Sequence, residues 1–343
     1  MVRATFEFER DHQVRGELFH DYLTQRKCGM LGAMYPLLDK ALAHIDHRLG
    51  PRNPLLQFRL RRVMRRRHSI DIRFNADTIE LERGGKVLRL PIHQWSYAHS
   101  VAGNFDAHFA TLEGVREDDR TVLDFSTPRT HRYRGSGFEY LLTSLPEEPE
   151  AIESYFAKGC PASGDLVFDA GANCGVTAHR LSALVGSTGK VIAFEPDPSN
   201  HAALCQNIAR HGLSNVVPVQ NGLAGKTGSY IFNADAALGS GISSFIPWPS
   251  TGKIVTIECL SMSDAIKQFG APSFIKMDIE GAELSVLRNA HLDTLRCSFT
   301  VDTGHLVGGH TTAERCEALF RKSDYESGTL REGGYVTTWA TPL

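Results

Sequence analysis

The sequence lacks long apolar runs, paired cysteines and an excess of charge of either sign. No window approaches the ~18 uninterrupted apolar residues of a membrane-spanning helix, and the first residues carry charges where a secretory signal has its apolar stretch. The seven cysteines include no C-x-x-C pair, which favours reduced thiols over a disulfide framework or a zinc site. The formal net charge of −2 excludes a global attraction to nucleic acid. We therefore expect a cytoplasmic globular protein.

With 343 residues, of which 42% are hydrophobic, the chain is long enough for two domains. Residues 1–68 are expected to be helical, because apolar residues recur there at steps of three and four. Residues 69–149 are expected to form a β-rich accessory region, in which alternating apolar residues flank Gly84 and Gly85 as in a hairpin. The run PEEPE then predicts a hinge before a domain over 150–343.

Six arginines are concentrated in the run RLRRVMRRRH at 59–68. Such a run is typical of a solvated helix face, and it is also compatible with docking onto an anionic partner. No basic strand with interleaved aromatic residues accompanies it, so we do not expect nucleic acid among the partners.

From residue 151 onwards, short apolar strands alternate with amphipathic helices. The expected strands are 165–171, 190–196, 216–222, a strand that leads into a helix over 273–290, and 297–306. This alternation predicts a mostly parallel sheet with helices on both faces, a Rossmann-like α/β fold. In such a sheet the ligand binds at the carboxyl ends of the strands.

A glycine-rich turn follows the first of these strands, in the pattern D-x-G-x-N-x-G from Asp169 through Gly171 and Asn173 to Gly175. A dinucleotide fingerprint would have glycine at position 173 as well, and a carboxylate beside the turn suits a cationic ligand such as S-adenosylmethionine better than a pyrophosphate. Glu195 ends the second strand, 26 residues after Asp169, where a carboxylate can accept hydrogen bonds from both ribose hydroxyls.

The next two strand ends carry candidate reaction-centre residues. Lys276, Asp278 and Glu280 alternate in an extended segment, so they are expected to project to one side while the intervening apolar residues project to the other. A salt bridge followed by a helix-starting glutamate is the structural alternative. Asp302 and His305 follow the fifth strand, and a histidine there has a suitable pKa for general-base catalysis. Between the third and fourth strands, residues 237–249 are expected to form a loop that closes over the site or a simple surface excursion.

Three ordered segments, VFDAGANCG, AFEPDPSNHAALCQNIARHGLSNV and FIKMDIEGAELSVLRNA, resemble the FkbM-type methyltransferases over about residues 165–290. The resemblance implies a class I S-adenosylmethionine-dependent fold and O-methylation of a hydroxyl on a sugar, polyketide or similar small metabolite. It places Asp278 and Glu280 in the reaction centre. With Lys276 and His305 they form the predicted catalytic set. The predicted cofactor contacts are Asp169, Gly171, Asn173, Gly175, Glu195, Pro196 and Asn221.

Several alternatives stay open on the sequence alone. A divalent cation held by Asp278, Glu280 and Asp302 could lower the pKa of the acceptor hydroxyl. The domain could instead methylate RNA or protein that docks on the arginine run, or it could be a non-catalytic partner that keeps the nucleotide fold. A homo-oligomer is also compatible with the sequence.

Overall fold

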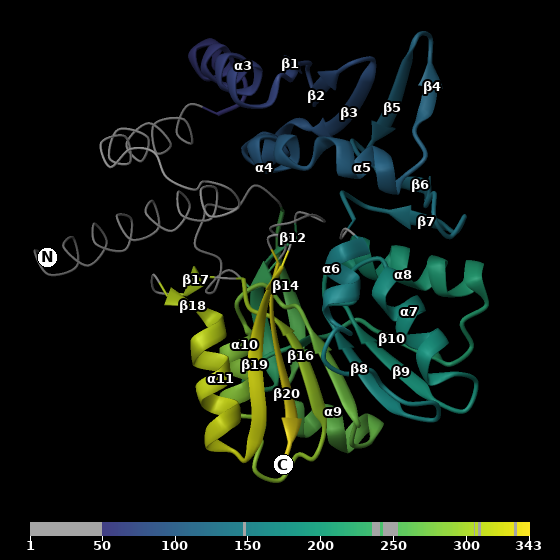
Figure 1. The fold of residues 1–343 in the computed structure, drawn as a ribbon, viewed down its shortest axis with the longest axis vertical. Coiled ribbons are helices and arrows are strands. Elements are labelled where there is room, and N and C mark those ends of the chain that lie inside the picture. The colour runs from purple at the N-terminus through teal and green to yellow at the C-terminus, as the bar shows by residue number, and fades with distance from the viewer. Residues whose placement is uncertain are drawn as a thin grey trace, which may run out of the picture. The chain divides into compact units, whose positions relative to one another are not determined.

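The computed structural model describes residues 50–146, 149–234, 241–242, 253–304, 306–307, 310–332 and 335–343 (Figure 1). The helices expected before residue 50, most of the loop expected at 237–249, and His305 lie outside these residues. The chain divides into a first unit, Met1–Pro146, and a second unit, Glu147–Leu343. No helix of the described residues is both long and apolar enough to cross a membrane.

The first unit combines the helix α3 (Pro54–His68) with a five-stranded sheet in the order β1-β2-β3-β5-β4. The strands are β1 (Asp71–Phe74), β2 (Thr78–Arg83), β3 (Lys86–Pro91), β4 (Val115–Glu117) and β5 (Arg120–Asp124). The predicted hairpin at Gly84 and Gly85 is confirmed, since both have positive φ and they join β2 to its antiparallel neighbour β3. The region is not β throughout, because residues 92–111 form three short helices, η1 (Ile92–Tyr97), α4 (Ala98–Gly103) and α5 (Phe105–Thr111). A separate antiparallel pair, β6 (Arg129–Arg132) and β7 (Glu139–Leu142), follows the sheet.

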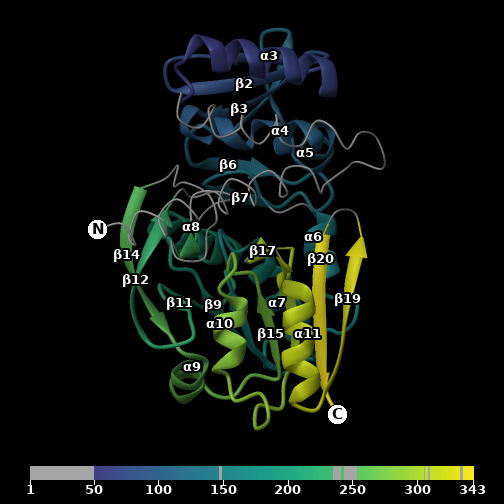
Figure 2. The same ribbon diagram turned by 90° about the vertical axis from the view of Figure 1, so that its left-hand side faces the viewer.

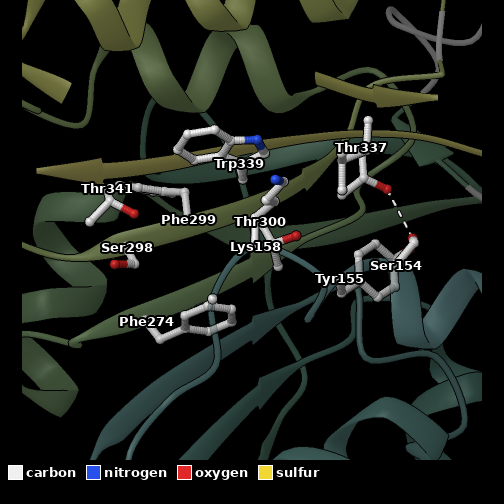
Figure 3. A pocket seen from close by; sticks show the side chains of 12 residues that line it. Ser154, Tyr155, Lys158, Phe274, Ser298, Phe299, Thr300, Thr337, Trp339 and Thr341 are labelled. Carbon is white, nitrogen blue, oxygen red and sulfur yellow. Dashed lines mark hydrogen bonds between the residues drawn. The ribbon is translucent and has the colours of Figure 1, made fainter. Parts of the chain in front are cut away.

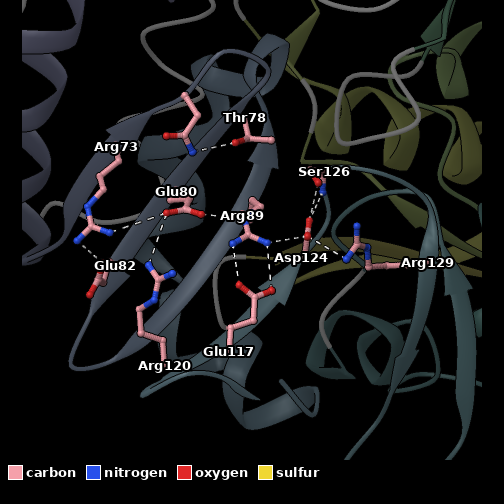
Figure 4. A network of polar contacts seen from close by, with 11 residues as sticks. Arg73, Thr78, Glu80, Glu82, Arg89, Glu117, Arg120, Asp124, Ser126 and Arg129 are labelled. Carbon is pink, nitrogen blue, oxygen red and sulfur yellow. Dashed lines mark hydrogen bonds and ion pairs between the residues drawn. The ribbon is translucent and has the colours of Figure 1, made fainter. Parts of the chain in front are cut away.

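One arginine ties four strands of this sheet together (Figure 4). The Arg89 guanidinium on β3 donates to Glu80 on β2 at 2.8 Å, to Glu117 on β4 at 3.0 Å and to Asp124 on β5 at 2.9 Å. Its side chain is only 18% exposed. The hydrogen bond to Glu117 is the largest of the effects that raise the pKa of Arg89, so the ion-pair network is a structural feature of the unit.

The second unit is an α/β domain with a seven-stranded sheet in the order β10-β9-β8-β15-β16-β20-β19. The first five strands are parallel, and β20 runs antiparallel to both of its neighbours. The strands are β8 (Leu166–Ala170), β9 (Lys190–Phe194), β10 (Val216–Val219), β15 (Phe274–Met277), β16 (Ser298–Asp302), β19 (Tyr325–Glu332) and β20 (Tyr335–Pro342). All five strands predicted from residue 151 onwards are confirmed, whereas the hairpin of β19 and β20 was not predicted.

Helices cover both faces of this sheet, as the alternation of buried residues requires. Val167 and Val191 pack with one set of helices, and their chain neighbours Phe168 and Ile192 pack with the other. The first set is α6 (Pro149–Ser154), α7 (Val176–Val185) and α8 (Pro198–His211). The second set is α9 (Met262–Phe269), α10 (Glu283–Arg288) and α11 (Thr312–Lys322). Figure 2 shows α10 and α11 side by side on their face of the sheet.

A small second sheet fills the chain between β10 and β15, where only a loop was expected. Its strand order is β11-β14-β12-β13, and its centre is the antiparallel pair of β12 and β14. The strands are β11 (Gly222–Leu223), β12 (Gly228–Ala234), β13 (Gly241–Ile242) and β14 (Lys253–Leu260). A two-stranded ladder of β17 (Leu306–Val307) and β18 (His310–Thr311) precedes α11.

Candidate functional site at the strand ends

The turn after β8 passes against the exit of β15, and Gly171 of the predicted motif makes this approach possible. Gly171 has φ +80°, and a Cβ atom there would lie 1.8 Å from the carbonyl oxygen of Asp278. Gly175 has φ +90° and is the N-cap of α7, where a Cβ atom would meet Leu204 at 2.6 Å. Both positions therefore need glycine, and between them Asn173 also adopts a left-handed conformation, at φ +48°.

Glu195, directly after β9, holds two backbone turns at once. Its Oε2 accepts the Asn173 N–H at 2.8 Å, and its Oε1 accepts the Asp197 N–H at 2.8 Å. The side chain is buried, and this burial raises its pKa from 4.5 to about 8 against the opposing effect of these hydrogen bonds. The sequence predicted a ribose ligand for this carboxylate. That contact stays a prediction, and the structure shows that Glu195 joins the glycine-rich turn to the end of β9.

Lys276 and Asp169 form a buried ion pair beneath the strand ends. They are register partners on the adjacent parallel strands β15 and β8, and Lys276 Nζ lies 3.5 Å from Asp169 Oδ1. The same ammonium donates to the carbonyl of Gly171 at 2.9 Å. As predicted, Ile275 and Met277 pack on the opposite face. Both members of the pair are at most 1% exposed, so the structure places their charges below the surface of the site.

Tyr155, which follows α6, contacts Lys276 of β15 and Asp278, which directly follows that strand. Lys276 Nζ lies 5.1 Å above the centre of the Tyr155 ring, and the Tyr155 hydroxyl donates to Asp278 Oδ2 at 3.1 Å. Asp278 is half-buried, and its backbone N–H donates to the Ala170 carbonyl at 2.9 Å. No hydrogen bond to Asp278 Oδ1 occurs in the described structure. Nothing in the sequence singled out Tyr155, because the contact joins positions 123 residues apart.

The turn that carries Asp278 and Glu280 is held by a buried carboxylate. Glu283 is completely buried, and its Oε1 accepts the N–H groups of Ile279 at 3.2 Å and Gly281 at 3.0 Å. Glu280 is half-buried and has φ +52°, which is unusual for a residue other than glycine. Glu283 lies in the segment FIKMDIEGAELSVLRNA, but its capping role was not predicted.

The remaining predicted residues lie along the same edge of the sheet or outside the described chain. Asp302 ends β16, where the register puts it level with Asp278, and its Oδ1 accepts the Gly304 N–H at 2.8 Å. Pro196 and Asn221 are half-buried and follow β9 and β10. Within the described ranges, no group of three His, Cys, Asp or Glu side chains is spaced to hold a metal ion, and the trio of Asp278, Glu280 and Asp302 is therefore not such a group.

A small pocket lies on the side of the sheet where Tyr155 lies (Figure 3). It extends from Tyr155 to Phe274 and Ser298, the first residues of β15 and β16, and Trp339 of β20 also lines it. The Ser154 hydroxyl lies 3.0 Å from that of Thr337 at its rim. Because this pocket points toward the amino ends of the parallel strands, it is distinct from the cluster at their carboxyl ends.

Comparisons with known proteins identify the part of the chain that carries this cluster. Residues 169–327 match the family described as Methyltransferase FkbM domain. Over 126 residues, the chain is 29% identical to the hexuronic acid methyltransferase AglP of Haloferax volcanii, which covers 36% of this chain and 49% of that protein. The chain thus spans about half the length of this curated relative.

Solved structures with a similar chain path include two methyltransferases. Precorrin-6y C5,15-methyltransferase from Geobacter metallireducens superposes with a TM-score of 0.41 at 11% identity, covering 60% of this chain and 93% of that chain. A SAM-dependent methyltransferase from Aquifex aeolicus superposes with a TM-score of 0.35 at 13% identity, covering 56% and 86%. By its match over residues 169–327, which include the end of β8, all of β9 and β15, and the exits of these strands, the chain contains an FkbM-type methyltransferase domain.

Proposed function

We propose that residues 150–343 are a class I, Rossmann-like domain that transfers a methyl group from S-adenosylmethionine to a hydroxyl group. The strand order supports this proposal. Numbered along the chain, the five parallel strands of the sheet have the order 3-2-1-4-5 of a doubly wound fold, and β8 and β15 flank the point where that order reverses. Ligands of such sheets bind outside the carboxyl ends at this point, which is where Gly171 and Asp278 approach each other.

The residues at these strand ends fit an adenosyl cofactor. Each Glu195 oxygen accepts one backbone hydrogen bond and keeps a second lone pair for a ribose hydroxyl. The turn from Gly171 to Gly175 would enclose the amino-acid part of the cofactor, with Pro196 and Asn221 on the adjoining edge. When bound, the cofactor supplies an electrophilic methyl group on a sulfonium.

The charge balance of the site favours a cation. Lys276 already pairs with Asp169, so this pair contributes little net charge. Asp278 and Glu280 are then the acidic groups left to face the ligand, because burial raises the pKa of Glu195 to about 8 and keeps that carboxyl mostly neutral at pH 7. We infer that Asp169 and Lys276 act as positioning residues, which hold β8 and β15 together beneath the glycine-rich turn.

Asp278 is the best placed proton acceptor among the described residues. The Tyr155 hydroxyl donates a hydrogen bond to Asp278 Oδ2 and so fixes the orientation of the carboxylate. The other oxygen, Oδ1, would then accept the proton of a substrate hydroxyl. Glu280 lies on the same turn and is the second candidate. Near-attack positioning of the two reactants would supply most of the acceleration, and a base would add about 10²–10⁴-fold.

We propose that the acceptor is a hydroxyl of a sugar or a related small metabolite. The support is the similarity to AglP, whose name describes a hexuronic acid methyltransferase. The substrate walls of such domains come from loops and accessory regions, which differ most between relatives.

The meeting of the Gly171 turn, Glu195 and Asp278 at one edge of the sheet is the observation that carries this function. Incubation of the chain with S-adenosylmethionine and pools of hydroxylated sugars, followed by mass spectrometry, should reveal a product heavier by one methylene, about 14 Da. The double variant Asp278→Ala/Glu280→Ala should not form it, whereas the exposed-site control Glu326→Gln should. Unaltered turnover in the double variant would contradict the assigned reaction centre.

A further inference from the structure

The helix α3 of the first unit is unusual in its charge. It contains six arginines and no acidic residue over its 15 positions. Arg65 pairs with Asp71, but Arg62 and Arg66 are exposed and form no ion pair within the described part of the chain. Since the net charge of the protein is −2, this helix is a local basic surface on a nearly neutral molecule.

Two large apolar side chains share the solvent-facing side of the helix with these arginines. Leu55 is 69% exposed and Phe58 is 62% exposed. At 3.6 residues per turn, Leu55, Phe58, Arg62 and Arg66 fall within an arc of roughly 80°. We call these four residues the α3 face. The buried residues Leu56 and Met64 lie on the other side, against the unit's own core, so the packing of α3 does not account for the exposed pair.

We propose that the α3 face docks on an anionic lipid surface. Arginine side chains on such a helix can bind lipid phosphate and carboxylate groups, while adjacent leucine and phenylalanine side chains enter the boundary between head groups and acyl chains. A single-stranded RNA would also attract the arginines and could stack on Phe58. It would leave the aliphatic Leu55 in water, so the exposed pair favours lipid.

Sedimentation with vesicles tests this docking on the full chain. We expect binding to vesicles of 30% phosphatidylserine in phosphatidylcholine, weaker binding to pure phosphatidylcholine, and a decrease as salt is raised. Arg62→Gln/Arg66→Gln should lower the partition coefficient about 25-fold, at roughly fivefold for each arginine. Phe58→Ser should lower it about tenfold, because its ring no longer leaves water.

The matched control removes the same charge from the second unit. Arg288 and Arg331 are exposed, and Arg288→Gln/Arg331→Gln should bind the vesicles as the unaltered chain does. Circular dichroism of each variant confirms folding, which the exposed positions should not disturb. Equal binding to both vesicle types, an unchanged partition coefficient in Arg62→Gln/Arg66→Gln, or tighter capture of a 20-nucleotide single-stranded RNA than of the anionic vesicles would overturn the proposal.

Discussion

The buried carboxyl of Glu195 should make the stability of the second unit depend on pH. Its pKa is about 8 in the folded chain, because burial disfavours the charged form, against 4.5 for an ordinary glutamate. The folded state therefore binds an extra proton between these two values. A raised folded-state pKa means that the stabilising contribution is complete below pH 4.5 and is lost as the pH rises toward 8.

The size of this effect follows from the two pKa values. Between pH 5.5 and 7.5, Glu195 should lower the free energy of unfolding by about 2.5 kcal/mol. Glutamine cannot ionise, so Glu195→Gln should lack this loss. It should instead show a constant penalty of about 1–3 kcal/mol, because its amide can accept only one of the two backbone hydrogen bonds.

Thermal unfolding of the chain and of Glu195→Gln at matched ionic strength measures the difference directly. For a unit of this size, 1 kcal/mol shifts Tm by roughly 2–4 °C, so the Tm of the variant relative to the unaltered chain should rise by about 5–10 °C between pH 5.5 and 7.5. The exposed-site control Glu326→Gln should follow the unaltered chain at every pH. A Tm difference between Glu195→Gln and the unaltered chain that stays constant over this range would refute the assignment of a buried, protonated carboxyl.

Three further predictions concern the turn, the aromatic contact and the first unit. In a denaturant titration, Gly171→Ala should lower the free energy of unfolding by about 2–4 kcal/mol and weaken cofactor binding, because the new Cβ would meet the Asp278 carbonyl. Gly212 also has a positive φ, but a Cβ there would have no atom within 4 Å, so the control Gly212→Ala should lower it by only about 1 kcal/mol. Tyr155→Phe should fold and keep its affinity for the cofactor product. Because Asp278 loses its hydrogen-bond donor, kcat should fall by about tenfold and the pH–rate profile should shift. An unchanged profile would speak against a positioning role for Tyr155. Arg89→Ala should destabilise the first unit by about 3–5 kcal/mol in chemical denaturation, because it leaves three carboxylates without their shared cation, and a loss under 1 kcal/mol would show that the network is dispensable.

Local sequence patterns predicted the framework of the second unit well. Glycines at a strand exit and a carboxylate at the next strand end are properties of single segments, so β8 and β9 could be predicted with boundaries close to those observed. Lys276 was correctly assigned to the face opposite Ile275 and Met277, because side chains alternate along a strand.

Features that depend on distant contacts could not be predicted in this way. The burial of Lys276 depends on Asp169 of the neighbouring strand and on the Tyr155 ring, and no local pattern links these three residues. The sheet of β11 to β14 was missed because most of its pairing joins β12 to β14 across an intervening segment. In the first unit, the helices over 92–111 were missed because each is at most seven residues long, too short for a clear helical period.

The most direct test of the central claim is isothermal titration of the chain with S-adenosylhomocysteine. If the ends of β8 and β9 form one cofactor site, we predict a single site per chain and an affinity that falls at least tenfold in Glu195→Ala while the control Glu326→Gln binds normally. Equal affinity in Glu195→Ala, or the absence of binding by the folded unaltered chain, would contradict the assignment of the cofactor site to these strand ends.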